Sequence, residues 1–320
     1  MVRFDAKDGR LSAPELVAET SNPSFLTVDG TILYAVNAND SGLVVSYQWD
    51  GGLRYLDAMR TSGAGPCYVA VSQSGRMAAV ANYRSGSVAV FQVDQGRFSG
   101  EAVARQHEGS GPNASRQKGP HAHYCQFAGN DRMLYVADLG IDEIVAYPIE
   151  DGRVGPGHTA LKLDGGDGPR HMAFYNDFVF IVNELSNTVV SARADHEKGL
   201  LERIDKKSTL PAGFEGESFA ADIHVSPDGK LYTSNRGNNS IAVFSILEDG
   251  RLEWVGSSPS GGDWPRNFAI APKGDFMLVA NQRTGNIVSF RIDAKTGMPV
   301  PTGHEVKVPE AVCLQFAGID

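Results

Sequence analysis

The sequence predicts an all-β fold built from repeated four-stranded units, on three observations. Apolar strands that end in Asn or Asp recur at intervals of 45 to 56 residues, with last residues at Asn37, Asn82, Asp138, Asn183, Asn235 and Asn281. The 36 glycines and 16 prolines among 320 residues suit many short strands joined by tight turns. Helical periodicity is nearly absent. A β-rich repeat of roughly 45 residues is typical of the blades of a β-propeller.

Each repeat is interpreted in the same order. A proline-marked turn leads into an inner strand such as YVAVS, HMAF or IHVS, and the strand that ends in Asn or Asp follows it. A third strand such as SVAVFQV comes next, and a weaker outer strand follows a glycine turn. Insertions at residues 105–123 and 208–224 account for the two longest intervals. Such long glycine-rich loops are more often functional than simple linkers.

The two ends of the chain predict how the ring of blades closes. Residues 1–20 have the pattern of a third and an outer strand, and AVCLQF, Ala311 to Phe316, has the pattern of an inner strand. Together they predict a seventh blade shared by both termini, which removes an exposed sheet edge. We therefore expect a single seven-bladed β-propeller domain over residues 1–320.

Charge and cysteine content exclude several classes of protein. The formal net charge is −9 and no run of Lys and Arg forms a basic stripe, so nucleic acid is not an expected partner. Cys67, Cys125 and Cys313 lack CxxC spacing, which predicts reduced, mostly buried thiols rather than disulfides or a zinc site. Neither a signal-peptide core nor an apolar run of about 20 residues is present, so we expect a cytoplasmic protein that does not bind membranes.

The predicted hairpins place chemically distinctive residues at one rim. In an antiparallel hairpin the start of the first strand lies beside the end of the second. Counting back along the inner strands gives Cys67, His123, Arg170, Ala221 and Arg266. The positions after the strand-ending Asn or Asp add Ala38, Tyr83, Leu139, Glu184, Arg236 and Gln282.

The rim set has the chemistry of an anion-binding site with a proton-transfer group. The arginines Arg170, Arg236 and Arg266 predict an anionic ligand, because guanidinium groups match phosphate or carboxylate oxygens. His123 or Glu184 could take a proton from water. The alternative is that each charged residue belongs to a solvated rim ion pair.

The roles of other polar residues are less specific. His171 and His224 fall one position out of the rim register, so we expect hydrogen-bonded packing residues there. The recurrent strand-ending Asn residues are expected to be turn formers that bond their own backbone. His121 could reach the pocket of His123 or cap a turn, and Trp264 could be a ligand platform or inter-blade packing.

Four segments, in order, resemble one known family: SRQKGPHAHYCQF, GPRHMAF with IVNELSNTV, ESFAADIHVSPDGKLYTSNRGNNSIAVF, and GDWPRNFAIAPKGDFMLVANQRTGNIVSF. They closely resemble the seven-bladed β-propeller lactonase family, which includes one type of 6-phosphogluconolactonase and is related to the carboxy-cis,cis-muconate cyclases. The resemblance runs from about residue 23 to the C-terminus, and the YxGTYT-like N-terminal strand of many relatives is missing. It implies a lactone-handling enzyme with active-site residues at His123, Arg170, Glu184 and Arg236.

The resulting hypothesis is hydrolysis of a sugar lactone, and the expected reaction is 6-phospho-D-glucono-1,5-lactone to 6-phosphogluconate. His123, or else Glu184, would activate water, while Arg170 and Arg236 would stabilise the oxyanion or hold substrate charge. Substrate-binding roles are expected for Arg266, as the phosphate ligand, and for Gln282, His121 and Trp264. No organic cofactor and no metal ion are expected.

Two alternatives stay open at this point. One is another sugar lactonase, or a lactonising cyclase acting on a carboxymuconate, which would use the same arginines. The other is a non-catalytic propeller scaffold, which predicts apolar rim patches and WD dipeptides, and this chain lacks the WD pattern. We expect a small anionic sugar lactone as the partner, and a monomer or weak homo-oligomer.

Overall fold

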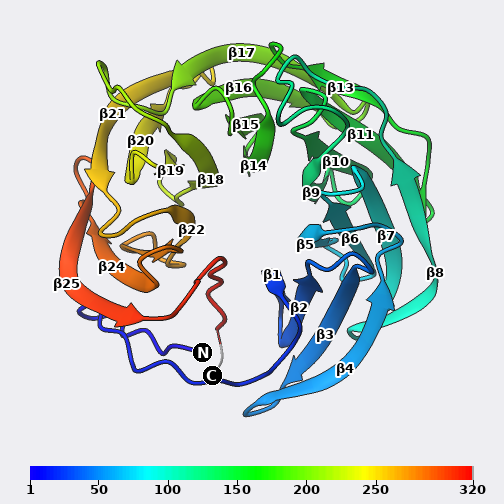
Figure 1. Cartoon of the computed structure of the whole chain (residues 1–320), viewed down its shortest axis with the longest axis horizontal. Coiled ribbons are helices and arrows are strands. Elements are labelled where there is room, and N and C mark those ends of the chain that lie inside the picture. The colour runs from blue at the N-terminus through cyan, green and yellow to red at the C-terminus, as the bar shows by residue number, and fades with distance from the viewer. Residues whose placement is uncertain (319–320) are drawn as a thin grey trace. The chain divides into compact units, whose positions relative to one another are not determined.

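The computed structural model describes residues 1–318, and its regular secondary structure in that range is all β, with 25 strands in six antiparallel sheets and no helix (Figure 1). No helix of the described chain is therefore long and apolar enough to cross a membrane. Residues 1–318 divide into two compact units. Unit 1 comprises Met1–Val17, His171–Arg193 and Arg203–Phe316, and unit 2 comprises Ala18–Arg170 and Ala194–Glu202 with Ala317 and Gly318. A single domain over residues 1–320 stays a prediction.

Unit 2 contains three sheets. The first has the order β1 (Pro23–Asp29), β2 (Ile32–Asn37), β3 (Leu43–Trp49) and β4 (Leu53–Arg60). The second has the order β5 (Pro66–Val71), β6 (Met77–Asn82), β7 (Ser87–Asp94) and β8 (Arg97–Gln106). The third contains β9 (Ala122–Ala128), β10 (Met133–Asp138), β11 (Glu143–Glu150), β12 (Arg153–Val154) and β13 (His158–Lys162), with both β12 and β13 paired to β11. Strand β5 contacts both β1 and β9, so the inner strands of this unit are neighbours.

Unit 1 contains most of one sheet and all of two more. The first is β14 (Pro169–Tyr175), β15 (Phe178–Asn183), β16 (Thr188–Asp195) and β17 (Leu200–Ser208). The second is β18 (Phe219–Val225), β19 (Lys230–Arg236), β20 (Ser240–Ile246) and β21 (Leu252–Pro259). The third is β22 (Pro265–Ile270), β23 (Phe276–Asn281), β24 (Asn286–Ile292) and β25 (Pro299–Lys307). Here too the inner strand β18 contacts β22. The order of inner, Asn-ended, third and outer strand predicted from the sequence is observed in these sheets.

The strand-ending asparagines bond a different part of the backbone from the one we expected. The Nδ2 of Asn82 donates to the carbonyl of Thr61, the residue that directly follows the outer strand β4 of the preceding sheet. Asn235 makes the same bond to Thr209, which follows β17, and Asn281 to Ser260, which follows β21. The prediction that these side chains bond their own turns is therefore wrong for these three. They tie each sheet to the end of the previous one.

The terminal segments do not form the predicted strands. Among residues 1–20 only an isolated bridge pairs Phe4 with Leu11, and residues 311–316 contain no strand. Pro14 cannot donate to a sheet, and the main-chain N–H of Leu314 donates instead to the side-chain oxygen of Asn267 at 2.6 Å. The apolar side chains are still partly buried, because Phe4 and Leu11 pack with Phe316 against the last sheet. Closure by a seventh blade shared between the termini is therefore not confirmed.

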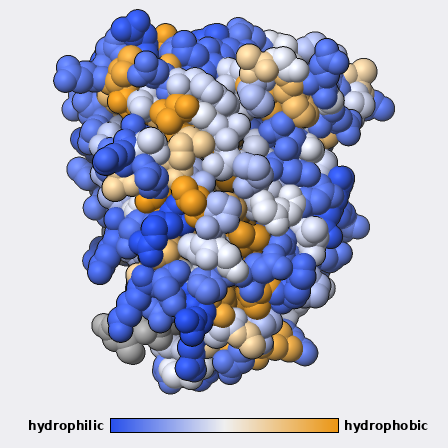
Figure 2. Space-filling model, turned by 90° about the vertical axis from the view of Figure 1, so that its left-hand side faces the viewer, coloured by the Kyte–Doolittle hydropathy of each residue, from blue (hydrophilic) through white to orange (hydrophobic). Residues whose placement is uncertain are grey.

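Large hydrophobic side chains at the surface are scattered. On the face shown in Figure 2, hydrophobic residues are interspersed among hydrophilic ones. The most exposed examples lie on different elements: Leu16 in the N-terminal segment, Tyr55 on β4 and Val300 on β25. Isolated exposed residues of this kind need no special explanation, whereas a continuous apolar patch would indicate a docking surface.

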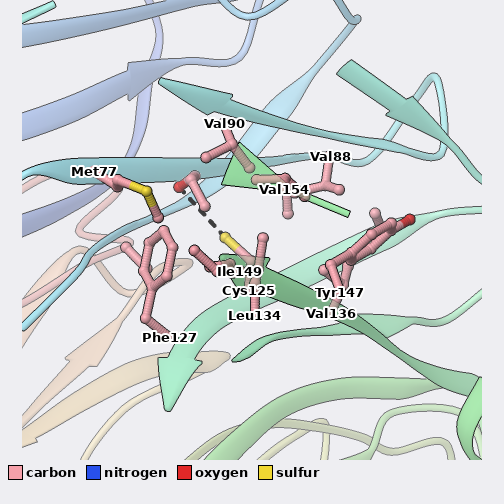
Figure 3. Close-up of a cluster of buried hydrophobic side chains, with 14 residues drawn as sticks. Met77, Val88, Val90, Cys125, Phe127, Leu134, Val136, Tyr147, Ile149 and Val154 are labelled. Carbon is pink, nitrogen blue, oxygen red and sulfur yellow. Dashed lines mark hydrogen bonds between the residues drawn. The ribbon is translucent and has the colours of Figure 1, made fainter. Parts of the chain in front are cut away.

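The cores lie between neighbouring sheets, as the cluster between β5–β8 and β9–β13 shows (Figure 3). There Phe127, Leu134 and Met77 pack around Cys125, whose thiol donates to the carbonyl of Ala79 at 3.4 Å. Burial raises the pKa of the Cys125 thiol well above its usual value, so it is a packing residue. All three cysteines are free thiols, as predicted, although Cys67 and Cys313 are only partly buried.

Candidate active site

The predicted site residues of several inner strands lie at β-bulges. In β5, Pro66 pairs with Asn82 and Tyr68 with Ala81, which leaves Cys67 as the extra residue. Strand β9 has the same irregularity at His123 and strand β22 has it at Arg266. A bulge bends the strand and re-aims the side chain of its extra residue. The residues selected by counting along the inner strands therefore lie where the regular pairing of these strands is interrupted.

In unit 2, two histidines gather around Tyr83, the residue that follows β6. The ring of His121 stacks on Tyr83 with centroids 4.5 Å apart, and the ring of His123 meets Tyr83 edge-on at 5.3 Å. His121 Nδ1 lies 2.9 Å from the Tyr83 carbonyl oxygen. The thiol of Cys67 is 3.8 Å from Nδ1 of His123, which is itself buried. His121 and His123 therefore contact the same tyrosine, and a substrate-binding role for His121 stays a prediction.

Asp138 fixes both ends of the insertion that carries His121. Its Oδ2 is 2.7 Å from Nδ1 of the buried His107, near the start of the insertion. Its Oδ1 accepts from the main-chain N–H of His121 at 2.6 Å and from that of Gly140 at 2.9 Å. With His107 in the tautomer that carries its proton on Nδ1, all three partners are donors and suit a carboxylate, which is consistent with this strand alone among the six ending in Asp.

A second carboxylate, Asp142, holds the turn that leads to Arg170. Asp142 Oδ1 accepts from Nε2 of Gln117 at 2.8 Å and from the main-chain N–H of Gly168 at 2.7 Å, and Oδ2 accepts from Gly166 at 2.8 Å. Gln117 belongs to the insertion, and Gly168 stands two residues before Arg170, whose side chain is almost completely buried. Asp142 thus connects the insertion to the backbone that presents Arg170.

In unit 1 the central feature is a buried ion pair. Arg236 Nη2 lies 2.7 Å from Oε2 of Glu184, and both side chains are at most 7% exposed. Arg236 also donates to the carbonyls of Phe219 and Ala220 at the start of β18. Its guanidinium lies over the ring of Trp264, with Cζ 5.5 Å from the ring centroid. Buried charges need such pairing and hydrogen bonding, so the orientation of both groups is well defined.

The remaining predicted residues of unit 1 lie at the same end of the last sheet. Pro265 pairs with Asn281, so Arg266 and Gln282 follow paired positions, and Arg266 Nη1 donates to Gln282 Oε1 at 3.5 Å. The main-chain N–H of Gln282 donates to the carbonyl of Trp264 at 3.0 Å. Trp264 packs against Phe219 and lies beside the arginine of the ion pair, so its packing role is observed, whereas its role as a ligand platform stays a prediction.

Asp222 is a buried carboxylate that joins three inner strands of unit 1. It accepts from Nδ1 of His171 at 2.7 Å, Nε2 of His224 at 3.0 Å and Nδ2 of Asn267 at 2.6 Å, residues that lie on β14, β18 and β22. Burial opposes ionisation of Asp222, but the two histidines outweigh it and hold its pKa far below the usual value. Burial likewise disfavours charge on His224, yet Asp222 raises the pKa of that partly exposed imidazole. The expectation of hydrogen-bonded packing histidines is confirmed.

The predicted residues fall into two groups, one in each unit. Unit 2 holds His121, His123 and Arg170, and unit 1 holds Glu184, Arg236, Trp264, Arg266 and Gln282. Sequence reasoning missed the carboxylates behind them. Asp138 had a visible signal, as the one Asp among the strand-ending asparagines, while Asp142 and Asp222 had none. Within residues 1–318 no group of three or more His, Cys, Asp or Glu side chains is arranged to hold a metal ion.

Comparison with known proteins identifies the family. A model of the family described as "Lactonase, 7-bladed beta-propeller" matches residues 1–316. The chain is 35% identical over 324 residues to a 6-phosphogluconolactonase of Bacillus subtilis, covering 98% of this chain and 92% of that protein. The structure of a putative 6-phosphogluconolactonase from Bacteroides fragilis is similar with a TM-score of 0.90 and 33% identity, covering 100% of this chain and 93% of that one.

A third relative differs in its described location and substrate. The structure of a periplasmic gluconolactonase from Pseudomonas aeruginosa has a TM-score of 0.92 and 30% identity, covering 100% of this chain and 94% of that one. These relatives are lactonases by name, so the scaffold reading that the sequence left open is set aside. The chain belongs to the seven-bladed β-propeller lactonase family, has an all-β propeller fold and is a lactonase.

Proposed function

We propose that the protein hydrolyses 6-phospho-D-glucono-1,5-lactone to 6-phosphogluconate. The observation that carries the proposal is the similarity to a 6-phosphogluconolactonase at 35% identity over 98% of the chain. It is supported by the site chemistry, because a phosphorylated substrate suits residues that include Arg170, Arg236 and Arg266. We also keep the cytoplasmic location as a prediction.

The proposed chemistry is attack of water on the lactone carbonyl. His123, at the bulge of β9, takes the proton from water, and Glu184 is the alternative base. Arg170 and Arg236 stabilise the negative charge that develops on the carbonyl oxygen. The bond between the carbonyl carbon and the ring oxygen then breaks, and the ring oxygen receives a proton to give the open-chain acid. Gln282, His121 and Trp264 are proposed substrate contacts.

The ion pair of unit 1 favours His123 over Glu184 as the base. A carboxylate 2.7 Å from a guanidinium is held by that contact, and a proton transferred to Glu184 would weaken the pair. His123, whose ring meets that of Tyr83 and whose Nδ1 lies 3.8 Å from the thiol of Cys67, is therefore the base that we propose. The contact between Glu184 and Arg236 gives Glu184 a different proposed role, which is to hold the guanidinium of Arg236 in place.

A coupled assay tests the proposal. The phosphorylated lactone is generated in situ, formation of 6-phosphogluconate is followed, and the spontaneous rate is subtracted. We expect wild-type turnover above background, and its loss in His123→Ala and in Arg170→Ala. His304→Ala and Arg251→Ala, at exposed or outer-strand positions, are the matched controls. A wild-type rate equal to background with folded protein would rule out this substrate, and unphosphorylated sugar lactones and carboxymuconates would then be tested with the same variants.

A further inference from the structure

Trp264 has an unusual backbone conformation for its residue type, as comparison with the equivalent residues before other inner strands shows. Four inner strands begin with proline, and in each the preceding residue has a positive φ angle: Asn22 (49°), Gly65 (60°), Gly168 (64°) and Trp264 (69°). Glycine adopts this region freely and asparagine tolerates it, whereas for a bulky residue it is strained. Three of the four positions thus carry the residue types that suit the backbone.

The strain at Trp264 is imposed by its surroundings. Its main-chain N–H donates to Oδ1 of Asn239 at 2.9 Å, and its carbonyl accepts from Gln282. These backbone bonds do not need an indole, since glycine would form them as well. Backbone strain of this type is concentrated at ligand clamps and active sites. The reason for a tryptophan must therefore be sought in its side chain.

The indole of Trp264 contacts two guanidinium groups. The Cζ of Arg283 is 3.4 Å from the ring centroid and that of Arg236 is 5.5 Å from it. Arg236 belongs to the buried pair with Glu184. The indole therefore holds an exposed cation, Arg283, at a fixed position relative to the ion pair at the proposed reacting end, through cation–π attraction.

Arg283 is placed to receive an anion. Its side chain is 56% exposed, and its Nη1 is 3.9 Å from Oδ2 of Asp263, which is too far for a hydrogen bond. Asp263 is itself engaged, because its Oδ1 accepts from Asn239 at 2.9 Å. Arg283 lies two residues beyond the end of β23, at the same end of the sheet as Arg266, the second residue of β22. Two arginines thus lie at one end of this sheet.

We propose that Arg283, held on Trp264, binds the phosphate group of the substrate and that Trp264 occupies its strained position for this purpose. The inference rests on the proposed function. It adds a residue that the sequence analysis did not select, and it assigns Trp264 the role of a positioning residue for a phosphate ligand. A fork of two N–H donors on a rigid platform suits phosphate oxygens better than a mobile surface arginine does.

The test compares two substrates in Arg283→Ala, Arg283→Lys and Trp264→Gly. Steady-state kinetics are measured with the phosphorylated lactone and with unphosphorylated D-glucono-1,5-lactone. In Arg283→Ala and Trp264→Gly we expect KM for the phosphorylated lactone to rise about tenfold more than KM for the unphosphorylated one, with kcat less affected. Arg283→Lys should recover part of the loss, because it keeps the charge but not the planar fork.

Trp264→Gly separates this proposal from a structural role. Glycine relieves the backbone strain at φ 69° but also removes the packing of the indole, so we expect a folded protein in which the loss of phosphate affinity exceeds any change common to both substrates. Arg251→Ala and Trp254→Ala, which remove an arginine and a tryptophan elsewhere on unit 1, are the controls. Equal losses for both substrates, or no loss, would overturn the proposal.

A binding measurement keeps the two proposals distinguishable. Calorimetry with 6-phosphogluconate and with gluconate needs no turnover. If wild type does not hydrolyse the phosphorylated lactone but binds 6-phosphogluconate, and Arg283→Ala selectively weakens that binding, the proposed function fails while this inference stands. If wild type hydrolyses the phosphorylated lactone and Arg283→Ala binds 6-phosphogluconate as tightly as wild type, the inference fails alone.

Discussion

The proposed site residues of the two units are held in place in different ways. In unit 2, buried carboxylates accept hydrogen bonds from main-chain N–H groups, as Asp138 does from His121 and Asp142 from Gly168. In unit 1, side chains hold one another, as Glu184 does with Arg236 and Trp264 with Arg283. The first arrangement depends on the path of a loop, and the second on charge and stacking between residues at or just beyond the ends of strands. Different substitutions should therefore disturb the two units.

The largest expected effect is loss of the ion pair in unit 1. In Arg236→Met the buried Glu184 loses a partner at 2.7 Å, which should lower the free energy of unfolding by roughly 3 kcal/mol. Turnover should fall at least about a hundredfold, because the group proposed to stabilise the oxyanion is gone. Urea denaturation and the coupled assay measure the two effects. Wild-type stability in this variant would show that the pair is not the constraint that we infer.

The next largest effect is expected in unit 2, from the hydrogen bonds of Asp138. In Asp138→Asn the oxygen that faces Nδ1 of His107 becomes an NH₂ group, and with the proton on Nδ1 two donors then face each other, so we expect a loss of about 1–3 kcal/mol of unfolding free energy. The reciprocal change Asn82→Asp should cost a similar amount, since its Nδ2 donates to the Thr61 carbonyl. The two substitutions keep the size of the side chain, and one replaces an oxygen by an NH₂ group while the other replaces an NH₂ group by an oxygen. If either one leaves the urea midpoint unchanged, that hydrogen-bond assignment is wrong.

A smaller effect concerns the pH dependence of unit 1. The raised pKa of His224 means that its contribution to stability is complete below its unfolded pKa of about 6.5 and is lost as pH rises through the folded value. The lowered pKa of Asp222 acts in the other direction and matters only in acid, where stability is lost as pH falls through its folded value. The other side chains that hydrogen-bond to Asp222 are those of His171 and Asn267.

The measurement is unfolding free energy between pH 6 and pH 9 for the wild type and His224→Gln. The wild type should lose more stability over this range, by less than about 1 kcal/mol, because 38% of the imidazole side chain is exposed and screened. Parallel pH profiles for the two proteins would exclude a charged His224 as a contributor.

The smallest expected effect is at an exposed ion pair of the same length. Arg251 Nε lies 2.7 Å from Oδ2 of Asp249, but both side chains are more than half exposed. Arg251→Met should therefore leave the urea midpoint within experimental error, in contrast to Arg236→Met, because solvent screens the exposed pair. A clear loss of stability here would mean that distance, rather than burial, decides the strength of these pairs.

The sequence predicted the repeated strands well because apolar alternation and turn residues are local signals. The register count also found His123 and Arg266 without knowing of bulges, because both lie a fixed number of residues before the last apolar residue of the strand. It could not predict Asp222, whose partners His171 and Asn267 lie 51 and 45 residues away in the chain. The terminal segments misled the prediction, because apolar residues that pack on a sheet have the same pattern as residues that join it.

The N-terminal packing on the last sheet has a consequence for biosynthesis. Phe4 contacts Phe276, and the carbonyl of Lys7 accepts from Arg291, a separation of 284 residues. A nascent chain therefore carries Phe4 and Leu11 without their partners until the last sheet has left the ribosome. The sheets of unit 2 have no such requirement and can form earlier. Translation of the final sheet sets the moment at which the first residues become protected from aggregation.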